Sequence, residues 1–155
     1  MLDTLRNFVA ELAGREQPEA RFGHSDYRLA AAALLIHAAM IDGKMDASER
    51  DKLHVVLKSH FGLDDDATAE LIDMGTLAEH EAVDLYHFTS QLNRSLDEAG
   101  RLGIVEMMWE IVLADGRVTE FEDNLMWRSA DLLGVSSRDR IALRQRVAGE
   151  RENSA

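Results

Sequence analysis

The chain has 155 residues, 46% hydrophobic and 30% charged, which is the composition of a globular domain with a core of its own. Its formal net charge of −12 argues against nucleic acid as the main partner, because phosphate contacts need clustered Lys and Arg. It contains no cysteine, so disulfides and thiolate metal sites are excluded and a reducing compartment is expected.

The hydropathy of the chain gives no indication of export or of a membrane span. No basic segment followed by an apolar stretch and a cleavage site opens the sequence, so we expect no secretion signal. The most apolar stretch, Leu29–Ile41, is interrupted by His37 and is shorter than the roughly 20 residues that a span needs. We therefore expect a cytoplasmic protein without integral membrane insertion.

The first predicted element is an amphipathic helix over about residues 2–13. One stripe of this helix carries Leu2, Leu5, Phe8, Val9 and Leu12. Glycines and the only proline then interrupt the pattern and predict a linker. The predicted organisation is an N-terminal helix and linker over 1–24, a helical domain over 25–150 and a tail over 151–155.

Helix-start signals divide the rest of the chain. Four stretches fit the capping-box pattern, in which an N-cap side chain and a Glu three residues later satisfy each other's backbone N–H groups: Asp46–Glu49, Thr76–Glu79, Ser95–Glu98 and Thr119–Glu122. Further N-cap candidates are Ser25 or Asp26, Asp64, and Ser136 or Ser137. The predicted helices cover about 25–41, 47–61, 65–74, 76–94, 96–114, 120–133 and 137–149.

An internal repeat appears when the chain is shifted by 73 residues. This shift places Leu29 on Leu102, Asp42 on Asp115, Gly43 on Gly116 and Glu49 on Glu122; after a one-residue gap, 61–66 falls on 133–138. One unit cannot bury its apolar helix alone, so two should pack together. The sequence therefore predicts an all-α, compact bundle of about seven to eight helices built from two pseudo-symmetric repeats, about 25–75 and 98–148, connected by the helix 76–94.

The two Asp-Gly joints have a structural interpretation. Each glycine would end a helix in the left-handed conformation that it adopts without a Cβ penalty. An apolar residue after the glycine, Met45 or Val118, would enter the core. The next residue, Asp46 or Thr119, would cap the following helix, and Glu49 or Glu122 would complete the capping box.

A cation-binding interpretation of the same joints stays open beside it. Asp42 and Asp115 face the negative end of a helix dipole, which costs about 0.3–1 kcal/mol unless turn N–H groups, a neighbouring Lys44 or Arg117, or a cation compensates them. A complete calcium-binding EF-hand is excluded, because the earlier ligand positions hold apolar residues. A pooled site for a divalent cation, calcium or zinc, would draw on Asp42, Glu49, Asp115 and Glu122, with Asp46 and Glu120 at its margin.

These joints also carry a family resemblance. Two Asp-Gly joints, each after an alanine- or leucine-rich helix and each followed by a Phe-Gly or Leu-Gly stop, resemble the tellurite-resistance TerB-like family over about Tyr27–Arg146. The resemblance implies an all-helical fold of two similar halves, cytoplasmic placement, and a role in stress or metal-oxyanion resistance without established enzymatic chemistry. It also implies an acidic, metal-binding surface, which would carry over to Asp42, Asp46, Glu49, Asp115 and Glu122. The two joints are not equally acidic, because the capping residue is Asp46 in the first joint and Thr119 in the second.

Other polar residues suggest further sites. Glu106 and Glu110 share one face of an otherwise apolar helix, so they form either its solvent edge or a buried ligand site. The pairs Asp51–His54 and Asp84–His87 have the spacing of di-metal carboxylate enzymes. His80 joins the second pair on a surface stripe that is either a solvated face or a site for adventitious zinc. Four residues are predicted to be core: Met107, Met108, Trp109 and Trp127.

The sequence contains no phosphate loop or nucleophile motif, so we expect a non-enzymatic binding protein with a protein partner. Three alternatives follow: a cation-responsive acidic patch at the joints, a purely structural scaffold that docks a partner, and a di-metal enzyme.

Overall fold

The computed structural model describes residues 22–23, 26–41, 43, 45–82, 84–114 and 116–154, with side chains as far as Glu150. The described residues form seven helices and no strand: α2 (Tyr27–Ala39), α3 (Ala47–Phe61), α4 (Asp65–Glu81), α5 (Tyr86–Ser95), α6 (Glu98–Val112), α7 (Glu120–Leu132) and α8 (Ser137–Ser154). The all-α prediction is therefore confirmed. The predicted helix over 2–13 lies outside the described residues.

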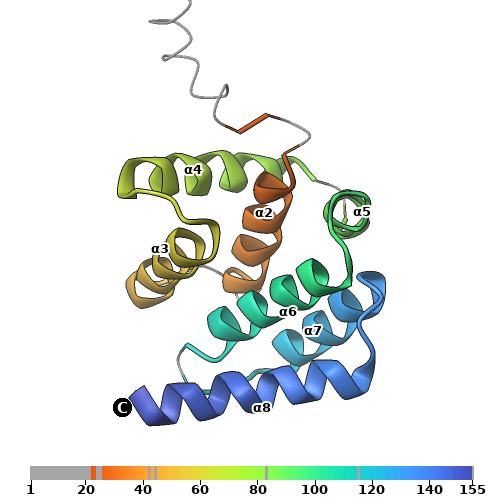
Figure 1. The fold of residues 1–155 in the computed structure, drawn as a ribbon. Coiled ribbons are helices and arrows are strands. Elements are labelled where there is room, and N and C mark those ends of the chain that lie inside the picture. The colour runs from red at the N-terminus through yellow and green to blue at the C-terminus, as the bar shows by residue number, and fades with distance from the viewer. Residues whose placement is uncertain are drawn as a thin grey trace, which may run out of the picture.

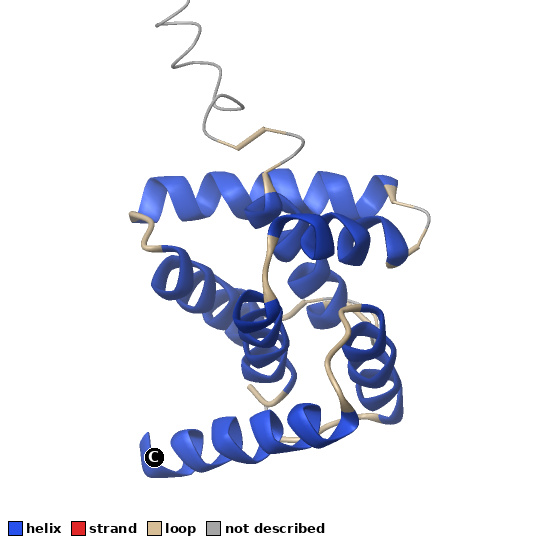
Figure 2. Ribbon diagram, turned by 45° about the vertical axis from the view of Figure 1, so that its right-hand side comes forward, coloured by secondary structure: helices blue, strands red, loops and turns tan. Residues whose placement is uncertain are grey.

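Helices α2 and α6 lie at the centre of the bundle. Figure 1 shows α4 along one end of the molecule and α8 along the other, with α2 and α6 between them. Helix α2 packs against α3, α4, α5 and α6, whereas α6 also packs against α3, α7 and α8. The residues from Ala30 to Ile36 are buried on every face, which is the pattern of a helix enclosed by others. Short loops join the helices (Figure 2). No helix in the described part is both long enough and apolar enough to cross a bilayer.

Capping side chains set most of the helix starts as predicted. Asp26 accepts from the Arg28 N–H at 2.9 Å, and Asp64 accepts from the Ala67 N–H at 2.7 Å. The Ser136 hydroxyl accepts from the backbone N–H of Asp139 at 3.1 Å at the start of α8. Each bond satisfies a backbone donor that the first helical turn leaves without a partner.

The predicted helix start at Thr76 is wrong. Helix α4 runs without a break from Asp65 to Glu81, and the Thr76 hydroxyl donates to the Ile72 carbonyl at 2.7 Å, as a threonine inside a helix does. Gly75 is not a stop: a Cβ on it would lie 2.9 Å from Ile36 Cδ1 and 3.0 Å from Ala32 Cβ. The glycine therefore lets α4 approach α2 closely.

The chain breaks further on, between α4 and α5. The predicted helix 76–94 is divided there, so its first part belongs to α4 and its second part to α5. The predicted cap at Ser95 is also wrong, because Ser95 ends α5 and Asp97 caps α6 by accepting from the Gly100 N–H at 2.9 Å.

The two proposed repeats have matching internal contacts. Helix α2 packs on α3 and α4, and α3 packs on α4; in the second repeat α6 packs on α7 and α8, and α7 packs on α8. Gly62 and Gly134, which the repeat aligns, both have positive φ, at 63° and 74°. These features agree with a duplication, and the pseudo-two-fold relation itself stays a prediction.

Two residues and one helix end depart from the sequence-based expectations. Trp127 is 52% exposed and is not core, unlike Met107, Met108 and Trp109. Phe22, within the predicted linker, is fully buried, and the Arg28 guanidinium lies 4.7 Å from the centre of its ring. Helix α8 also continues to Ser154, past its predicted end at residue 149.

Candidate functional site

The two Asp-Gly joints, here called the first elbow (residues 40–46) and the second elbow (residues 113–119), have the same turn. The Gly43 N–H donates to the Met40 carbonyl, and the Gly116 N–H donates to the Leu113 carbonyl, both at 3.0 Å. Gly43 has a φ of 133° and Gly116 a φ of 85°, values that favour glycine. At both elbows, therefore, a glycine with positive φ donates its N–H to the carbonyl three residues earlier.

A complete capping box follows each elbow. In the first, Glu49 Oε1 accepts from the Asp46 N–H at 2.9 Å while Asp46 Oδ1 accepts from the Glu49 N–H at 2.8 Å. In the second, Glu122 Oε1 accepts from the Thr119 N–H at 2.8 Å and the Thr119 hydroxyl accepts from the Glu122 N–H at 3.1 Å. The predicted boxes at these positions are confirmed.

The carboxylates at the elbows differ in burial. Glu49 is 8% exposed and Glu122 3% exposed, whereas Asp46 is exposed to solvent. The Glu49 backbone N–H and the Ser48 hydroxyl donate to Asp46, and these bonds hold the pKa of its carboxyl below the usual value. Met45 and Val118 are partly buried against the core, as predicted.

The pooled cation site falls only partly within the described residues. Asp42 and Asp115 lie outside them. Of the predicted ligands, the structure places Asp46 beside Glu49 and Glu122 beside Thr119, each in the capping box that follows its elbow. Among the residues that the structure describes, no three His, Asp or Glu side chains gather closely enough to hold a metal ion.

Glu106 and Glu110 lie at helix interfaces, partly buried and each beside a cation or a histidine. Glu110 Oε2 lies 2.8 Å from His60 Nε2, joining α6 to α3, and Glu106 Oε1 lies 2.9 Å from the Arg146 guanidinium, joining α6 to α8. The hydrogen bond to Glu110 raises the pKa of His60; burial opposes this, and the charges of Glu110 and Glu106 add to it. Both carboxylates therefore link helices.

The histidines of the proposed di-metal pairs have other surroundings. His54 Nε2 lies 3.0 Å from Asp65 Oδ1, which also accepts from Lys58 Nζ at 2.8 Å. His87 and Asp84 are exposed at the surface. The contacts of Asp65 with His54 and Lys58 connect α3 to the start of α4, and they do not bring the two carboxylate–histidine pairs together.

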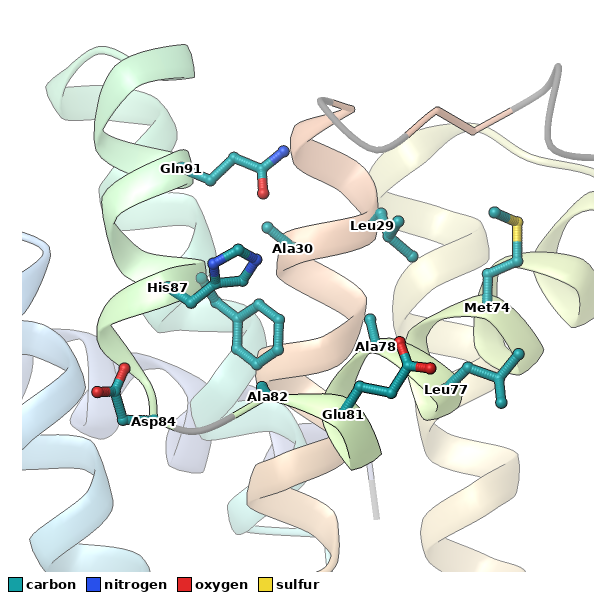
Figure 3. A pocket seen from close by; sticks show the side chains of 11 residues that line it. Leu29, Ala30, Met74, Leu77, Ala78, Glu81, Ala82, Asp84, His87 and Gln91 are labelled. Carbon is teal, nitrogen blue, oxygen red and sulfur yellow. The ribbon is translucent and has the colours of Figure 1, made fainter.

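A surface groove between α2, α4 and α5 is a feature that the sequence interpretation did not include (Figure 3). This α2–α4–α5 groove has a volume of about 550 Å³ and is lined by Leu29, Ala30, Met74, Leu77, Ala78, Glu81, Ala82, Asp84, His87, Phe88 and Gln91. Its lining is largely apolar, and Leu77 is 63% exposed at its rim. Large exposed apolar side chains beside an apolar hollow are typical of binding surfaces.

The groove continues along α2 into a more polar hollow. This hollow, of about 240 Å³, is also lined by Ala82, Asp84 and Phe88, and it adds His37, Glu79, Leu85 and Arg128. His37 Nδ1 lies 3.0 Å from Glu79 Oε2 there, joining α2 to α4. One apolar and one polar section therefore follow each other over the same side of α2.

A sequence signal for the groove exists on α4. Its buried stripe consists of Ala67, Thr68, Leu71, Ile72 and Gly75. Leu77 is an exposed apolar residue outside that stripe, and a helix that only covered a core would carry a polar residue there. This excess of apolar surface is what indicates a second contact for α4.

The fold, the elbows and the groove together define a small all-helical domain with two capped Asp-Gly elbows. The family model described as tellurite resistance protein TerB matches residues 28–145, most of the chain. The chain therefore belongs to the TerB family, and the resemblance seen in the sequence is confirmed. Comparisons with curated proteins and with solved structures gave no match.

Proposed function

We propose that this TerB-family protein is a non-enzymatic binding protein whose α2–α4–α5 groove holds an amphipathic helical segment of a protein partner. The observation that carries the proposal is Leu77, a large apolar side chain 63% exposed at the rim of an apolar groove. Leaving such a side chain in water forfeits about 1.5–3 kcal/mol that burial against a partner would return. The family's description, tellurite resistance protein, suggests that the partner belongs to a resistance system.

The shape and charge of the groove favour a helix with basic flanks. Two helices, α4 and α5, form its walls, and residues of α2 form its floor, so an apolar stripe on a third helix can lie between the walls. Glu81 and Asp84 stand at one end of the groove. Together with the net charge of −12, they favour Lys or Arg beside the apolar stripe of the partner.

Site-specific photocrosslinking tests this proposal in the full chain. A photoreactive amino acid in place of Leu77 should capture one protein partner in the cells that make this protein. The same amino acid in place of Val55 is a matched control, because Val55 is 56% exposed on α3 and lines none of the described hollows. Equal capture at both positions, or none at Leu77, would contradict the proposal.

A second candidate function is a cation response at the elbows. Two buried carboxylates, Glu49 and Glu122, follow the two elbows at matching positions, and carboxylate oxygens suit calcium. One oxygen of each already accepts a backbone N–H, so neither Glu can close a cation loop with both of its oxygens unengaged. Glu49 and Glu122 can therefore hold a cation only if Asp42 and Asp115 supply the remaining negative charge.

Thermal unfolding with added ions tests the second candidate. If the elbows bind calcium or zinc, the melting temperature of the wild-type chain should rise with the ion, and Asp42→Asn combined with Asp115→Asn should remove the rise. Binding to the folded state alone must stabilise it by mass action. A wild-type melting temperature that does not change with either ion would eliminate this candidate and leave the elbows as structural turns.

A further inference from the structure

We propose that residues 2–13 of this same chain dock in the α2–α4–α5 groove when no partner occupies it. The proposal rests on the binding role proposed for the groove and names what regulates it. The occupant would be the amphipathic helix that the sequence predicts over residues 2–13, and a partner's helix would have to displace it.

The N-terminal segment has the chemistry that the groove requires. At helical spacing its one apolar stripe consists of Leu2, Leu5, Phe8, Val9 and Leu12, and its other positions are mostly polar. An isolated helix of this length is marginal in water, so it needs an apolar surface on which to fold. Arg6 falls at the edge of the stripe, where Glu81 or Asp84 of the groove can pair with it.

The described chain begins beside the groove. Phe22 is fully buried and its ring lies under the Arg28 guanidinium, which holds the chain at the N-terminal end of α2. Leu29 and Gln91 line that same end of the groove (Figure 3). Phe22, the first residue that the structure describes, is therefore held at the end of α2 that contributes Leu29 to the groove.

The intervening chain is long enough for this docking. Residues 14–21 can span up to roughly 26 Å when extended. The wall of the groove from Met74 to Ala82 measures about 12 Å along α4, and a helix over residues 2–13 is about 18 Å long. A tether of this length keeps the segment at an effective concentration in the millimolar range, so docking needs only modest intrinsic affinity.

Cysteine pairs in the full chain test the docking directly. Because the chain has no cysteine of its own, two introduced cysteines report on one pair of positions without background. Val9→Cys with Leu77→Cys should form a disulfide within one chain at least several-fold faster than Val9→Cys with Val55→Cys. Equal rates for the two pairs would overturn the proposal. If the Val9–Leu77 disulfide formed only between two chains, the proposal would also be overturned, and the segment would instead be exchanged with a second copy.

Hydrogen exchange provides a measurement on the chain without cysteines. Phe8→Asp places a charge on the apolar stripe and should raise amide exchange in residues 74–82 and 84–91 several-fold. Asn7→Asp introduces the same residue on the polar face and should leave exchange unchanged. If amide exchange in residues 74–82 and 84–91 of Phe8→Asp equalled that of the wild type, the proposed docking would be overturned.

The two proposals fail separately. Loss of partner capture at Leu77 with the Val9–Leu77 link intact would overturn the binding function alone. Capture at Leu77 without that link would overturn the docking alone.

Discussion

The contact between Gly75 and α2 sets how closely helix α4 approaches helix α2. We expect Gly75→Ala to destabilise the protein by about 1–2 kcal/mol, although alanine is the better helix former by about 1 kcal/mol. The new Cβ would lie 3.0 Å from Ala32 Cβ and 3.3 Å from its carbonyl carbon, and neither atom can rotate away. Urea unfolding followed by circular dichroism measures the change.

Gly103 provides the matched control for this substitution. It also lies inside a helix, α6, but a Cβ there would meet nothing within 4 Å. Gly103→Ala should therefore stabilise the protein by about 0.4–1 kcal/mol, through helix propensity and a less flexible unfolded chain. If Gly75→Ala stabilised the protein equally, the close approach of α4 to α2 would be wrong.

At the residue scale, the capping pattern alone does not decide whether a residue begins a helix. Asp26, Asp46, Asp64 and Thr119 act as predicted because each begins a helix after a loop. Thr76 has the same sequence pattern but follows a glycine whose function is to admit α2, and no single-chain pattern distinguishes a stopping glycine from a packing glycine.

At the element scale, the contrast between Thr119 and Thr76 can be measured. Both residues are followed by Glu three positions later, but only Thr119 caps a helix. We expect Thr119→Ala to cost about 1 kcal/mol of unfolding free energy, because the Glu122 N–H loses its acceptor. Thr76→Ala should be neutral or stabilising by a few tenths of a kcal/mol.

Chemical denaturation of both variants makes this comparison, with Thr119→Ser as the control that restores the hydroxyl. Equal losses for Thr119→Ala and Thr76→Ala would mean that the second elbow does not depend on its capping box.

The pair His60–Glu110 gives the α3–α6 contact a dependence on pH. Because the pKa of His60 is raised in the folded protein, the pair contributes its full stability below about pH 6.5, the unfolded value, and loses it as pH rises through the folded value. The other charged groups at this contact are Glu106 and its partner Arg146. The pair is partly solvated, so we expect its contribution to be at most about 1 kcal/mol.

Unfolding free energies measured between about pH 6 and pH 8 test this contribution. His60→Gln should flatten the decline in stability that the wild type shows over this range, and His80→Gln, on an exposed part of α4, should not. An unchanged slope in His60→Gln would assign the pH dependence to another group.

At the scale of the whole molecule, the helices and their order could be predicted because each apolar face has to be covered. The groove could not, since it arises where α4, α5 and α2 meet and the break between α4 and α5 was misplaced by several residues. A predicted helix over 76–94 carries Ala82 and Asp84 inside a single element, so it does not provide the two separate walls that α4 and α5 form. The misplaced break thus concealed the surface on which the proposed function depends.

The central position of α2 leads to a final prediction about cooperativity. Helix α2 packs on α4 and α5 on one side and on α6 of the second half, so the halves share one core and should unfold in a single step. Leu34→Ala, which empties a fully buried site in α2, should cost about 2–5 kcal/mol. In a Trp127→Phe background, Trp109 in α6 is the only tryptophan, and its fluorescence midpoint in urea should shift as much as the circular dichroism midpoint. If the Trp109 midpoint stayed in place while the helix signal fell in two phases, the halves would be separate folding units, and a partner in the groove would stabilise only the first.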